Sequence, residues 1–302
     1  MTAPLALEVR GLTKSYGDVK ALRGVDLEVR RGEIFGFLGP NGSGKTTTIR
    51  CLLDLIRPDG GLLRVLGLDP QAEPLAVRTR AGYLPGELHL DDNLTAEGAL
   101  RLFNRLRRGR ADWTFVRQLT TRLDLDLGTP IKNLSKGNKQ KVGVVQALMH
   151  RPELLLLDEP TSGLDPLVQQ EVLRLVADAR AAGATVFFSS HVLSEVQETA
   201  ERVAIVRQGA VVEVAETTVL INRALRRVHV RFRQPVEASG LANVPGVRLL
   251  EEDGRRGVVL QVEGEMDALI KALAAFPVSD FETERPSLEE IFRAYYAGAE
   301  AK

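Results

Sequence analysis

Two periods organise the hydrophobic positions of this chain. Residues 5–9 and 25–29 alternate apolar and polar side chains, a pattern typical of strands with one exposed face. Residues 33–38, 153–158 and 185–190 are short and almost continuously apolar. Such runs fit strands of a parallel sheet that helices cover on both faces. The first part of the chain is therefore predicted to be an α/β layer structure.

Helical spacing fills the intervals between these runs. Residues 46–55 and 168–182 each predict one helix. Residues from about 92 to 150 are rich in Ala, Leu and Arg and contain little Pro. We interpret this longer segment as a helical insertion into the α/β part.

The pattern changes near residue 220. Asp253-Gly254 is a hairpin signal between two apolar stretches, and Ser287–Glu290 is a capping box that predicts a final helix. We predict two domains, residues 1–220 and residues 221–302, the second a small α+β domain without a recognisable chemical motif. Its apolar stretches and its helical segment are residues 228–232, 247–250, 258–262 and 266–276.

Composition narrows the class of protein. The chain has 302 residues, and Lys+Arg and Asp+Glu both count 40. This balance argues against non-specific binding of nucleic acid through a positive field. The single cysteine, Cys51, cannot form an internal disulfide, which favours a cytosolic chain in which Cys51 is a packed residue. No apolar run approaches the roughly 18 residues of a membrane span, and the N-terminus lacks the pattern of a signal peptide.

The strongest chemical signal is a match at every position to the phosphate-binding loop G-x-x-x-x-G-K-[ST]. Glycines let backbone N–H groups approach a di- or triphosphate, Lys45 can reach the β- and γ-phosphates, and the Thr46 hydroxyl can ligate Mg²⁺. An apolar run precedes the loop and a helix follows it, and the N-terminus of that helix favours an anion. The alternative is a glycine-rich turn that binds nothing. The loop consists of Gly39, Pro40, Asn41, Gly42, Ser43, Gly44, Lys45 and Thr46.

Two acids end the apolar run of residues 153–158. Asp158 and Glu159 follow a predicted strand at its carboxyl end, where ligands bind in open α/β sheets. Asp158 is placed to hold Mg²⁺, and Glu159 to orient and deprotonate an attacking water. Alone, the two acids could also cap the segment that follows, so the phosphate loop upstream decides in favour of the catalytic interpretation.

Three further segments carry weaker signals. Ser135 and Gly137 begin a helix, where an ordinary capped helix start explains them equally well. Asp165 ends the sequence Ser162-Gly163-Leu164-Asp165. His191 follows the predicted strand 185–190, which we expect to lie beside the strand that bears the two acids, so that His191 can reach a γ-phosphate.

Together these segments resemble an ATP-binding-cassette (ABC) ATPase domain. Residues 39–46, 134–140, 154–159 and 162–165, followed by His191, have the order and spacing of that family. The resemblance covers about residues 5–220. It implies an α/β P-loop NTPase fold of the ABC ATPase type, with a mixed sheet, an N-terminal antiparallel part and a helical subdomain at about residues 92–150.

The resemblance also implies how the site works. MgATP is the expected cofactor, with Lys45, Glu159 and His191 as catalytic residues and Thr46 and Asp158 as metal ligands. Tyr16 is expected to stack on adenine. Two chains are expected to dimerise head to tail, because the signature residues of the family, here Ser135 and Gly137, contact the nucleotide that the other chain binds. The further nucleotide-contacting residues implied by the family are Thr47, Ser135, Gly137 and Asp165.

The end of the chain carries a less specific likeness. Residues 286–292 look like the extension of bacterial cassette subunits that serve export systems with separately encoded membrane proteins. We therefore expect a peripheral subunit at the cytoplasmic face of the membrane that powers an exporter, without nucleic acid as a partner. The alternatives are a soluble ABC-type ATPase, which a single cassette disfavours, and an ATP-binding regulatory protein, which the presence of Glu159 and His191 disfavours.

Two departures from the family pattern stand out. Gly86 occupies a position that is usually Gln, and we hypothesise that Glu87 helps to complete the Mg²⁺ shell. Lys136 and Asn138 replace common signature residues, while Ser135 and Gly137 are retained.

A basic run in the helical insertion is expected to be a solvated surface, with lipid head groups or a membrane partner as the alternative. It consists of Arg101, Arg105, Arg107, Arg108 and Arg110.

Overall fold

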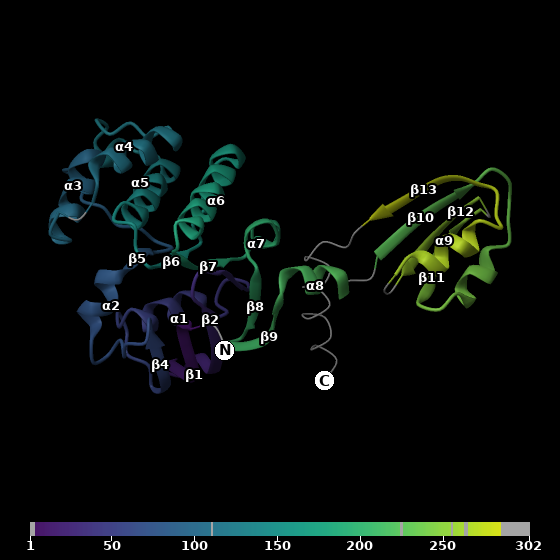
Figure 1. Cartoon of the computed structure of the whole chain (residues 1–302), viewed down its shortest axis with the longest axis horizontal. Coiled ribbons are helices and arrows are strands. Elements are labelled where there is room, and N and C mark those ends of the chain that lie inside the picture. Colours follow the sequence, from purple (N-terminus) through teal and green to yellow (C-terminus); the bar gives the residue numbers. More distant parts are fainter. Residues whose placement is uncertain (1–3, 110, 224–225, 255, 263–264, 285–302) are drawn as a thin grey trace. The chain divides into compact units, whose positions relative to one another are not determined.

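The chain divides into two compact units, residues 1–215 and residues 216–302 (Figure 1). The computed structural model describes residues 4–284 apart from residues 110, 224–225, 255 and 263–264. The division lies a few residues before the boundary predicted at residue 220. The predicted final helix that Ser287 would open lies outside the described residues, and so do residues 286–292 and Arg110.

A six-stranded sheet forms the centre of the first unit. Its strands lie in the order β5-β6-β7-β3-β8-β9, and the first five run parallel. All residues of β3, β6 and β7 are buried, as their continuous apolar runs predict. The strands are β3 (Ile34–Leu38), β5 (Ala81–Leu84), β6 (Leu154–Asp158), β7 (Thr185–Ser190), β8 (Arg202–Arg207) and β9 (Ala210–Glu216).

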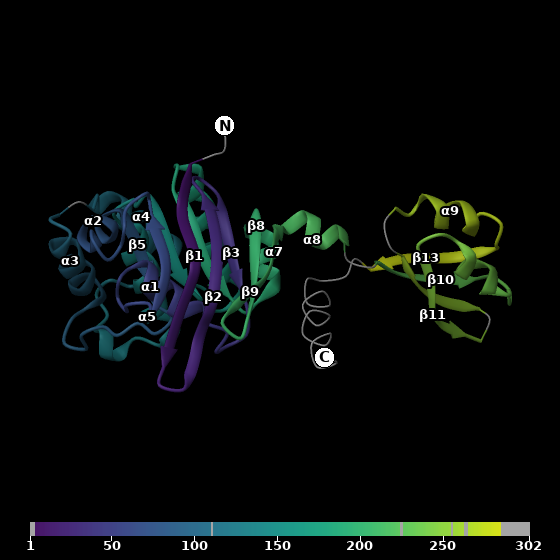
Figure 2. The ribbon, with the colours of Figure 1, turned by 90° about the horizontal axis from the view of Figure 1, so that it is seen from below.

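A second, antiparallel sheet has the order β2-β1-β4. The alternating segments 5–9 and 25–29 are parts of the long strands β1 and β2, which form a hairpin that turns at Gly17-Asp18. Helix α1 contacts β6 on one side and β2 and β4 on the other, so it lies between the two sheets within one apolar core (Figure 1). Figure 2 shows the long paired strands β1 and β2 from below. These elements are β1 (Leu5–Tyr16), β2 (Val19–Arg30), β4 (Gly60–Val65) and α1 (Lys45–Leu52).

The other helices of this unit include the predicted helical insertion. Helices α3 and α4 both pack on α5, and α5 packs on β5, which joins the insertion to the edge of the central sheet. Helix α6 contacts β7, and α7 contacts β3 and β7. The helices are α2 (Pro74–Arg80), α3 (Ala96–Leu106), α4 (Trp113–Arg122), α5 (Lys136–Leu148), α6 (Pro166–Ala181) and α7 (Leu193–Thr199), with the 3₁₀ turn η1 (Ile131–Asn133).

The second unit is an antiparallel sheet of order β11-β12-β10-β13. Strands β11 and β12 flank Asp253-Gly254 as a hairpin, which confirms the turn prediction. Leu269 and Leu273 of α9 join the apolar face of the sheet in a separate core. Its elements are α8 (Thr217–Arg223), β10 (Arg226–Phe232), η2 (Ala238–Asn243), β11 (Val247–Asp253), β12 (Gly257–Val262), α9 (Asp267–Leu273) and β13 (Val278–Glu284).

The described part of the chain contains no helix of the length and apolarity that crossing a membrane requires.

Candidate functional site

The phosphate loop joins β3 to α1, as predicted. Two positions of the loop have no room for a side chain. A Cβ on Gly39 would lie 2.5 Å from the carbonyl oxygen of Val206, and a Cβ on Gly44 would lie 2.8 Å from the carbonyl oxygen of Ala21. Gly42 and Gly44 also have φ values of 79° and 106°, which favour glycine. The backbone can therefore curl tightly enough to present its N–H groups, with those at the start of α1, to an anion.

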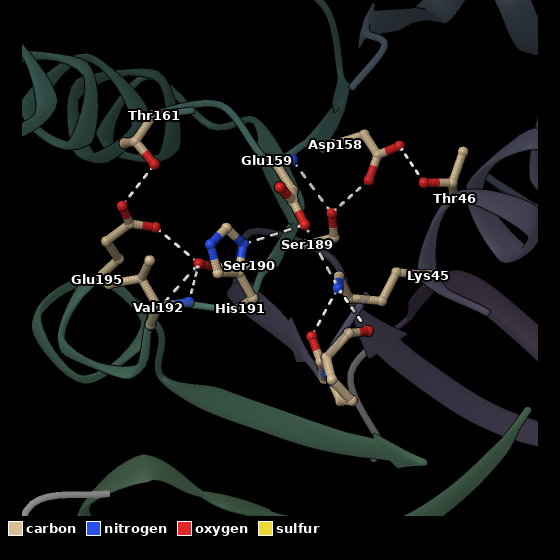
Figure 3. A network of polar contacts seen from close by, with 12 residues as sticks. Lys45, Thr46, Asp158, Glu159, Thr161, Ser189, Ser190, His191, Val192 and Glu195 are labelled. Carbon is tan, nitrogen blue, oxygen red and sulfur yellow. Dashed lines mark hydrogen bonds and ion pairs between the residues drawn. The ribbon is translucent and has the colours of Figure 1, made fainter. Parts of the chain in front are cut away.

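Lys45 is the first residue of α1 and is only 5% exposed. Its Nζ donates hydrogen bonds to the carbonyl oxygens of Gly39 at 2.6 Å and Pro40 at 3.2 Å, so the side chain arches back over the loop (Figure 3). The hydroxyl of Ser43 is buried without a hydrogen-bond partner among the described residues. The loop thus offers an ammonium group and an unused hydroxyl, both of which suit phosphate oxygens.

Asp158 and Thr46 meet beneath the loop. The Thr46 hydroxyl donates to Asp158 Oδ2 at 2.6 Å, and the Ser189 hydroxyl donates to Oδ1 at 2.5 Å (Figure 3). Asp158 is 1% exposed, so these hydrogen bonds offset the free-energy cost of removing its carboxylate from water. The meeting follows from strand order, because the carboxyl ends of β6, β7 and β3 are neighbours in the sheet.

Glu159 lies between a lysine and a histidine. Its Oε1 is 3.4 Å from Lys45 Nζ and 3.2 Å from His191 Nδ1, whereas His191 itself is half exposed (Figure 3). The predicted neighbours β6 and β7 do pair, and this pairing brings His191 to the acids. A carboxylate between an ammonium group and an imidazole, open on the histidine side, can accept a proton from a water beside it.

The backbone of Glu159 has an unusual conformation that neighbouring groups hold in place. Its φ is +51°, which is uncommon for a residue with a side chain. Its N–H lies 3.2 Å from the carbonyl oxygen of Ser189 and 3.1 Å from the Ser189 hydroxyl, and its carbonyl accepts from Gln140 Nε2 at 3.2 Å. Three elements, β6, β7 and α5, therefore set the direction of this carboxylate.

Sequence reasoning gave no role to Ser189, although it contacts both acids. The available signal was a pair of serines, Ser189-Ser190, at the end of an otherwise apolar strand. Gln140 lies within residues 134–140, one of the segments that carry the family resemblance, but its bond to the Glu159 carbonyl spans 19 positions and has no local signature.

The signature residues take part in a different set of contacts. Ser135 is the N-cap of α5 and accepts from the N–H of Asn138 at 3.1 Å. A Cβ on Gly137 would lie 2.8 Å from the carbonyl oxygen of Gly163, so this helix start abuts the segment before Asp165. No hydrogen bond or ion pair within the described residues joins these positions to Lys45 or Glu159.

The described hydrogen bonds and ion pairs also do not connect Asp165, Tyr16 or Thr47 with the group formed by Lys45, Thr46, Asp158, Glu159 and His191. Asp165 caps α6 by accepting from the N–H groups of Leu167 and Val168. Tyr16 ends β1 and is 48% exposed, with Lys14 Nζ 5.7 Å from its ring centroid. Thr47 belongs to the first turn of α1, next to Thr46. The roles that the family resemblance implies for these residues stay predictions.

Gly86 lies directly against the buried acid. A Cβ at this position would be 3.1 Å from Asp158 Oδ2, so the backbone comes close to the expected metal site. Glu87 is exposed and lines a hollow of about 370 Å³ together with residues such as Tyr83 and His89. The described contacts do not include one between Glu87 and Asp158, and its role in a Mg²⁺ shell stays a prediction.

The basic run has a mixed environment. Arg101 pairs with Glu97 at 2.6 Å and lies over the ring of Trp113, and Arg107 donates to backbone carbonyls of residues 78 and 81. Arg105 and Arg108 are exposed.

The single cysteine, Cys51, is buried in α1. Burial raises the pKa of its thiol to about 11, which makes it an inert packed residue as predicted.

Comparisons with known proteins agree with this geometry. Residues 22–162 match the family model described as ABC transporter, and residues 221–296 match the C-terminal domain of DrrA1-3-like ATP-binding proteins. Daunorubicin resistance ATP-binding protein DrrA3 of Streptomyces coeruleorubidus is 37% identical, over 96% of this chain and 95% of its own length. The bacitracin transport ATP-binding protein BcrA of Bacillus licheniformis is also 37% identical, over 68% of each chain.

Solved structures show the same fold. The ATP-binding subunit of an ABC transporter aligns with a TM-score of 0.64 and 31% identity, over 71% of this chain and 91% of that one. A dimeric ATP-binding cassette bound to ADP and Pi aligns with a TM-score of 0.61 and 24% identity, over 70% and 98%. The loop, the paired acids and the histidine sit on that shared fold, and this chain belongs to the ABC transporter family as an ATP-binding subunit that hydrolyses ATP.

Proposed function

We propose that this subunit hydrolyses MgATP at the cluster of Lys45, Thr46, Asp158, Glu159 and His191 and thereby powers an exporter. The observation that carries the proposal is the position of the Glu159 carboxylate. It lies within 3.4 Å of Lys45 Nζ and 3.2 Å of His191 Nδ1, at the mouth of a loop shaped for phosphates. A general base beside the terminal phosphate is what hydrolysis requires.

Mg²⁺ fits the oxygens at the base of the loop. Magnesium usually takes one or two protein oxygens and completes its shell with water and phosphates, and Thr46 and Asp158 offer a hydroxyl and a carboxylate 2.6 Å apart. The described residues contain no group of three His, Cys, Asp or Glu side chains suited to a metal. Water and phosphate oxygens would therefore supplement the two protein oxygens. Bound there, the ion would neutralise charge on the phosphates.

The protein side chains divide the remaining work. Lys45 would leave its two backbone acceptors for the β- and γ-phosphates, a charge-assisted contact. Glu159 would take the proton of the attacking water, and His191 would orient that water or contact the γ-phosphate from the open side. Catalysis of this kind consists mainly of charge stabilisation and positioning.

A second copy is proposed to complete each site. Ser135 and Gly137 show no described contact with the Lys45 cluster, yet they begin a helix whose N–H groups suit a phosphate. Head-to-tail pairing would bring these residues of one copy to the nucleotide of the other, with Tyr16 against adenine and Thr47 and Asp165 at the nucleotide. The related cassette of known structure is itself described as dimeric.

We place the subunit at the cytoplasmic face of a membrane, bound to a separate membrane-spanning chain. Two of the relatives that match it over most of their length are named as daunorubicin resistance ATP-binding proteins, and BcrA as a bacitracin transport ATP-binding protein. These names favour export over import.

The decisive experiment is the substitution Glu159→Gln. Gln can hold a water but cannot take its proton, so the rate of ATP hydrolysis should fall by about 10²–10⁴-fold while ATP still binds. The same variant should accumulate as an ATP-bound dimer in analytical ultracentrifugation. Hydrolysis at the wild-type rate would remove Glu159 as the base, and a strictly monomeric variant at saturating ATP would remove the shared site.

A further inference from the structure

A second buried carboxyl group lies close to the site, and hydrolysis as described does not use it. Glu195 is on the first turn of α7 and is 6% exposed. Its Oε1 accepts from the hydroxyl of Thr161 at 2.5 Å and its Oε2 from that of Ser190 at 2.7 Å (Figure 3). Both hydroxyl-bearing residues are themselves at most 4% exposed. Burying a carboxyl group costs free energy, and the two hydroxyl donors offset part of that cost by fixing Glu195 to both segments.

The two partners of Glu195 flank the proposed catalytic pair along the chain. Thr161 comes two residues after Glu159, and Ser190 directly precedes His191. Since the Glu159 carboxylate lies 3.2 Å from His191 Nδ1, the contacts close a ring. The ring runs from Glu159 along the chain to Thr161, across Glu195 to Ser190, along the chain to His191 and back to Glu159.

The helix that carries Glu195 has a rigid base. Val196, the next residue, is fully buried against β3, where a Cβ on Gly36 would lie 2.7 Å from its Cγ1. On the other side of the ring, the N–H of Val192 donates to the Ser190 hydroxyl at 2.9 Å, which ties down the turn that contains His191. Glu195 is thus held by packing, and it can hold two loops in turn.

We infer that Glu195 is a positioning residue that braces Glu159 against His191 by tying Thr161 to Ser190. It touches no reacting atom. Thr161 also begins the segment that ends at Asp165 and includes Gly163, whose carbonyl abuts Gly137. The brace therefore connects the histidine of one site with the segment beside the signature residues. This inference rests on the proposed catalytic roles of Glu159 and His191.

A matched pair of substitutions at Thr161 tests the brace in the full-length chain. Thr161→Val keeps the shape but removes the hydroxyl, and Thr161→Ser keeps the hydroxyl. We expect Thr161→Val to lower kcat by about tenfold to a hundredfold, the scale of a misplaced catalytic group, and Thr161→Ser to stay near the wild type. ATP affinity should change by less than about twofold in both, because Lys45 and its loop lie outside the ring. Equal kcat values for the two variants would overturn the inference.

A double-substitution cycle separates positioning from a general loss of structure. If Thr161 acts through His191, the variant with both Thr161→Val and His191→Ala should be no slower than His191→Ala alone, within about twofold. If the two losses multiply, Thr161 contributes independently and the brace is wrong. Single-turnover hydrolysis at high protein concentration gives these rates on the assembled site.

Hydrogen exchange supplies a readout that does not depend on activity. Glu195→Ala should raise exchange in residues 161–165 and 190–193 together, with residues 39–46 unchanged, whereas a rise in only one of the two segments contradicts the brace. Should Thr161→Val fold poorly, Ser190→Ala breaks the ring at its other bond. Glu159→Gln in the single-turnover hydrolysis assay separates the hypotheses. If it loses hydrolysis while Thr161→Val does not, only the brace fails, and if it hydrolyses normally, the proposed function fails.

Discussion

The two units of this chain bury different kinds of side chain. Among the described residues, every buried charged side chain lies in the first unit: Glu33, Lys45, Lys141, Asp158 and Glu195. The core of the second unit is formed by apolar residues such as Val228, Val230 and Leu260. Both units contain a sheet packed against helices, so the sheet alone does not create a site.

The two sheets differ in strand direction, which decides whether the carboxyl ends of neighbouring strands lie at the same edge. In the first unit, parallel neighbours end at the same edge, and the polar residues that follow β3, β6 and β7 converge there. In the second unit the paired strands run antiparallel, so consecutive strand ends point in opposite directions. Buried charge in the first unit is stabilised by converging hydrogen bonds, and the second unit has no such requirement.

Disrupting the apolar core of the second unit should have the largest effect on stability and none on the site. Leu260 is fully buried between Val228 and Leu249 of the adjacent strands, so Leu260→Ala should destabilise that unit by about 2–5 kcal/mol. ATP affinity should stay within about twofold. Leu250→Ala, at a 40% exposed position of the same sheet, is the matched control.

The single tryptophan makes this measurable. Trp113 lies in the first unit, so its fluorescence reports unfolding of that unit, while circular dichroism reports both. Leu260→Ala should shift a circular-dichroism transition in urea and leave the fluorescence midpoint in place. A joint shift of both signals would mean that the units do not unfold independently.

The second effect concerns nucleotide binding. Lys45→Ala removes a cation from the phosphate loop, and ATP affinity should fall by about tenfold to a hundredfold, which corresponds to about 1.5–3 kcal/mol for a charged hydrogen bond. Calorimetry with Mg²⁺ measures the change. Lys141→Ala removes another buried lysine of the same unit, which donates to the carbonyl of Asp124, and should leave ATP affinity unchanged.

The third effect is at the close approach of Gly86 to Asp158. The added methyl group of Gly86→Ala would lie 3.1 Å from Asp158 Oδ2, so the carboxylate must shift by a few tenths of an ångström. We expect the Mg²⁺ concentration for half-maximal hydrolysis to rise a few-fold, because Mg²⁺ demands near-ideal geometry. Glu87→Ala belongs in the same titration: an unchanged Mg²⁺ requirement would show that Glu87 does not complete the shell.

The smallest effect depends on pH. The Arg80 guanidinium bonds both oxygens of Glu153 and holds the pKa of that carboxyl below its usual value. This stabilisation is fully present above the usual glutamate pKa of about 4.3, and it is lost progressively as the pH falls from there through the lowered pKa of the folded state. Because Glu153 is half exposed, Arg80→Gln should cost less than about 1 kcal/mol at pH 7.

Urea unfolding at pH 7 and at about pH 4 measures this difference. The gap in stability between Arg80→Gln and the wild type should shrink at the lower pH. A gap that is equal at both values would mean that Arg80 stabilises the unit through packing and not through its ion pair.

The sequence by itself determined the parts of the site that are local. Residues 39–46 specify their own turn, because glycine spacing and the following helix are short-range features. The apolar runs specify buried strands, and the acids at the end of one run mark its functional end. Period and capping residues also located α1, α6 and the helical insertion, whereas α2, α7 and α8 were not predicted. Helix α9 (Asp267–Leu273) is shorter than the predicted segment 266–276.

Apart from the expected pairing of β6 with β7, only the tertiary structure decided which of these local pieces meet. The strand order β5-β6-β7-β3-β8-β9 does not follow the chain, and periodicity assigns a residue to a face but not to a neighbour. The bonds of Ser189 to Asp158 and of Thr161 to Glu195 join residues 31 and 34 positions apart. The +51° φ of Glu159 and the approach of Gly86 to Asp158 likewise arise from packing, because no local pattern encodes a contact between distant segments.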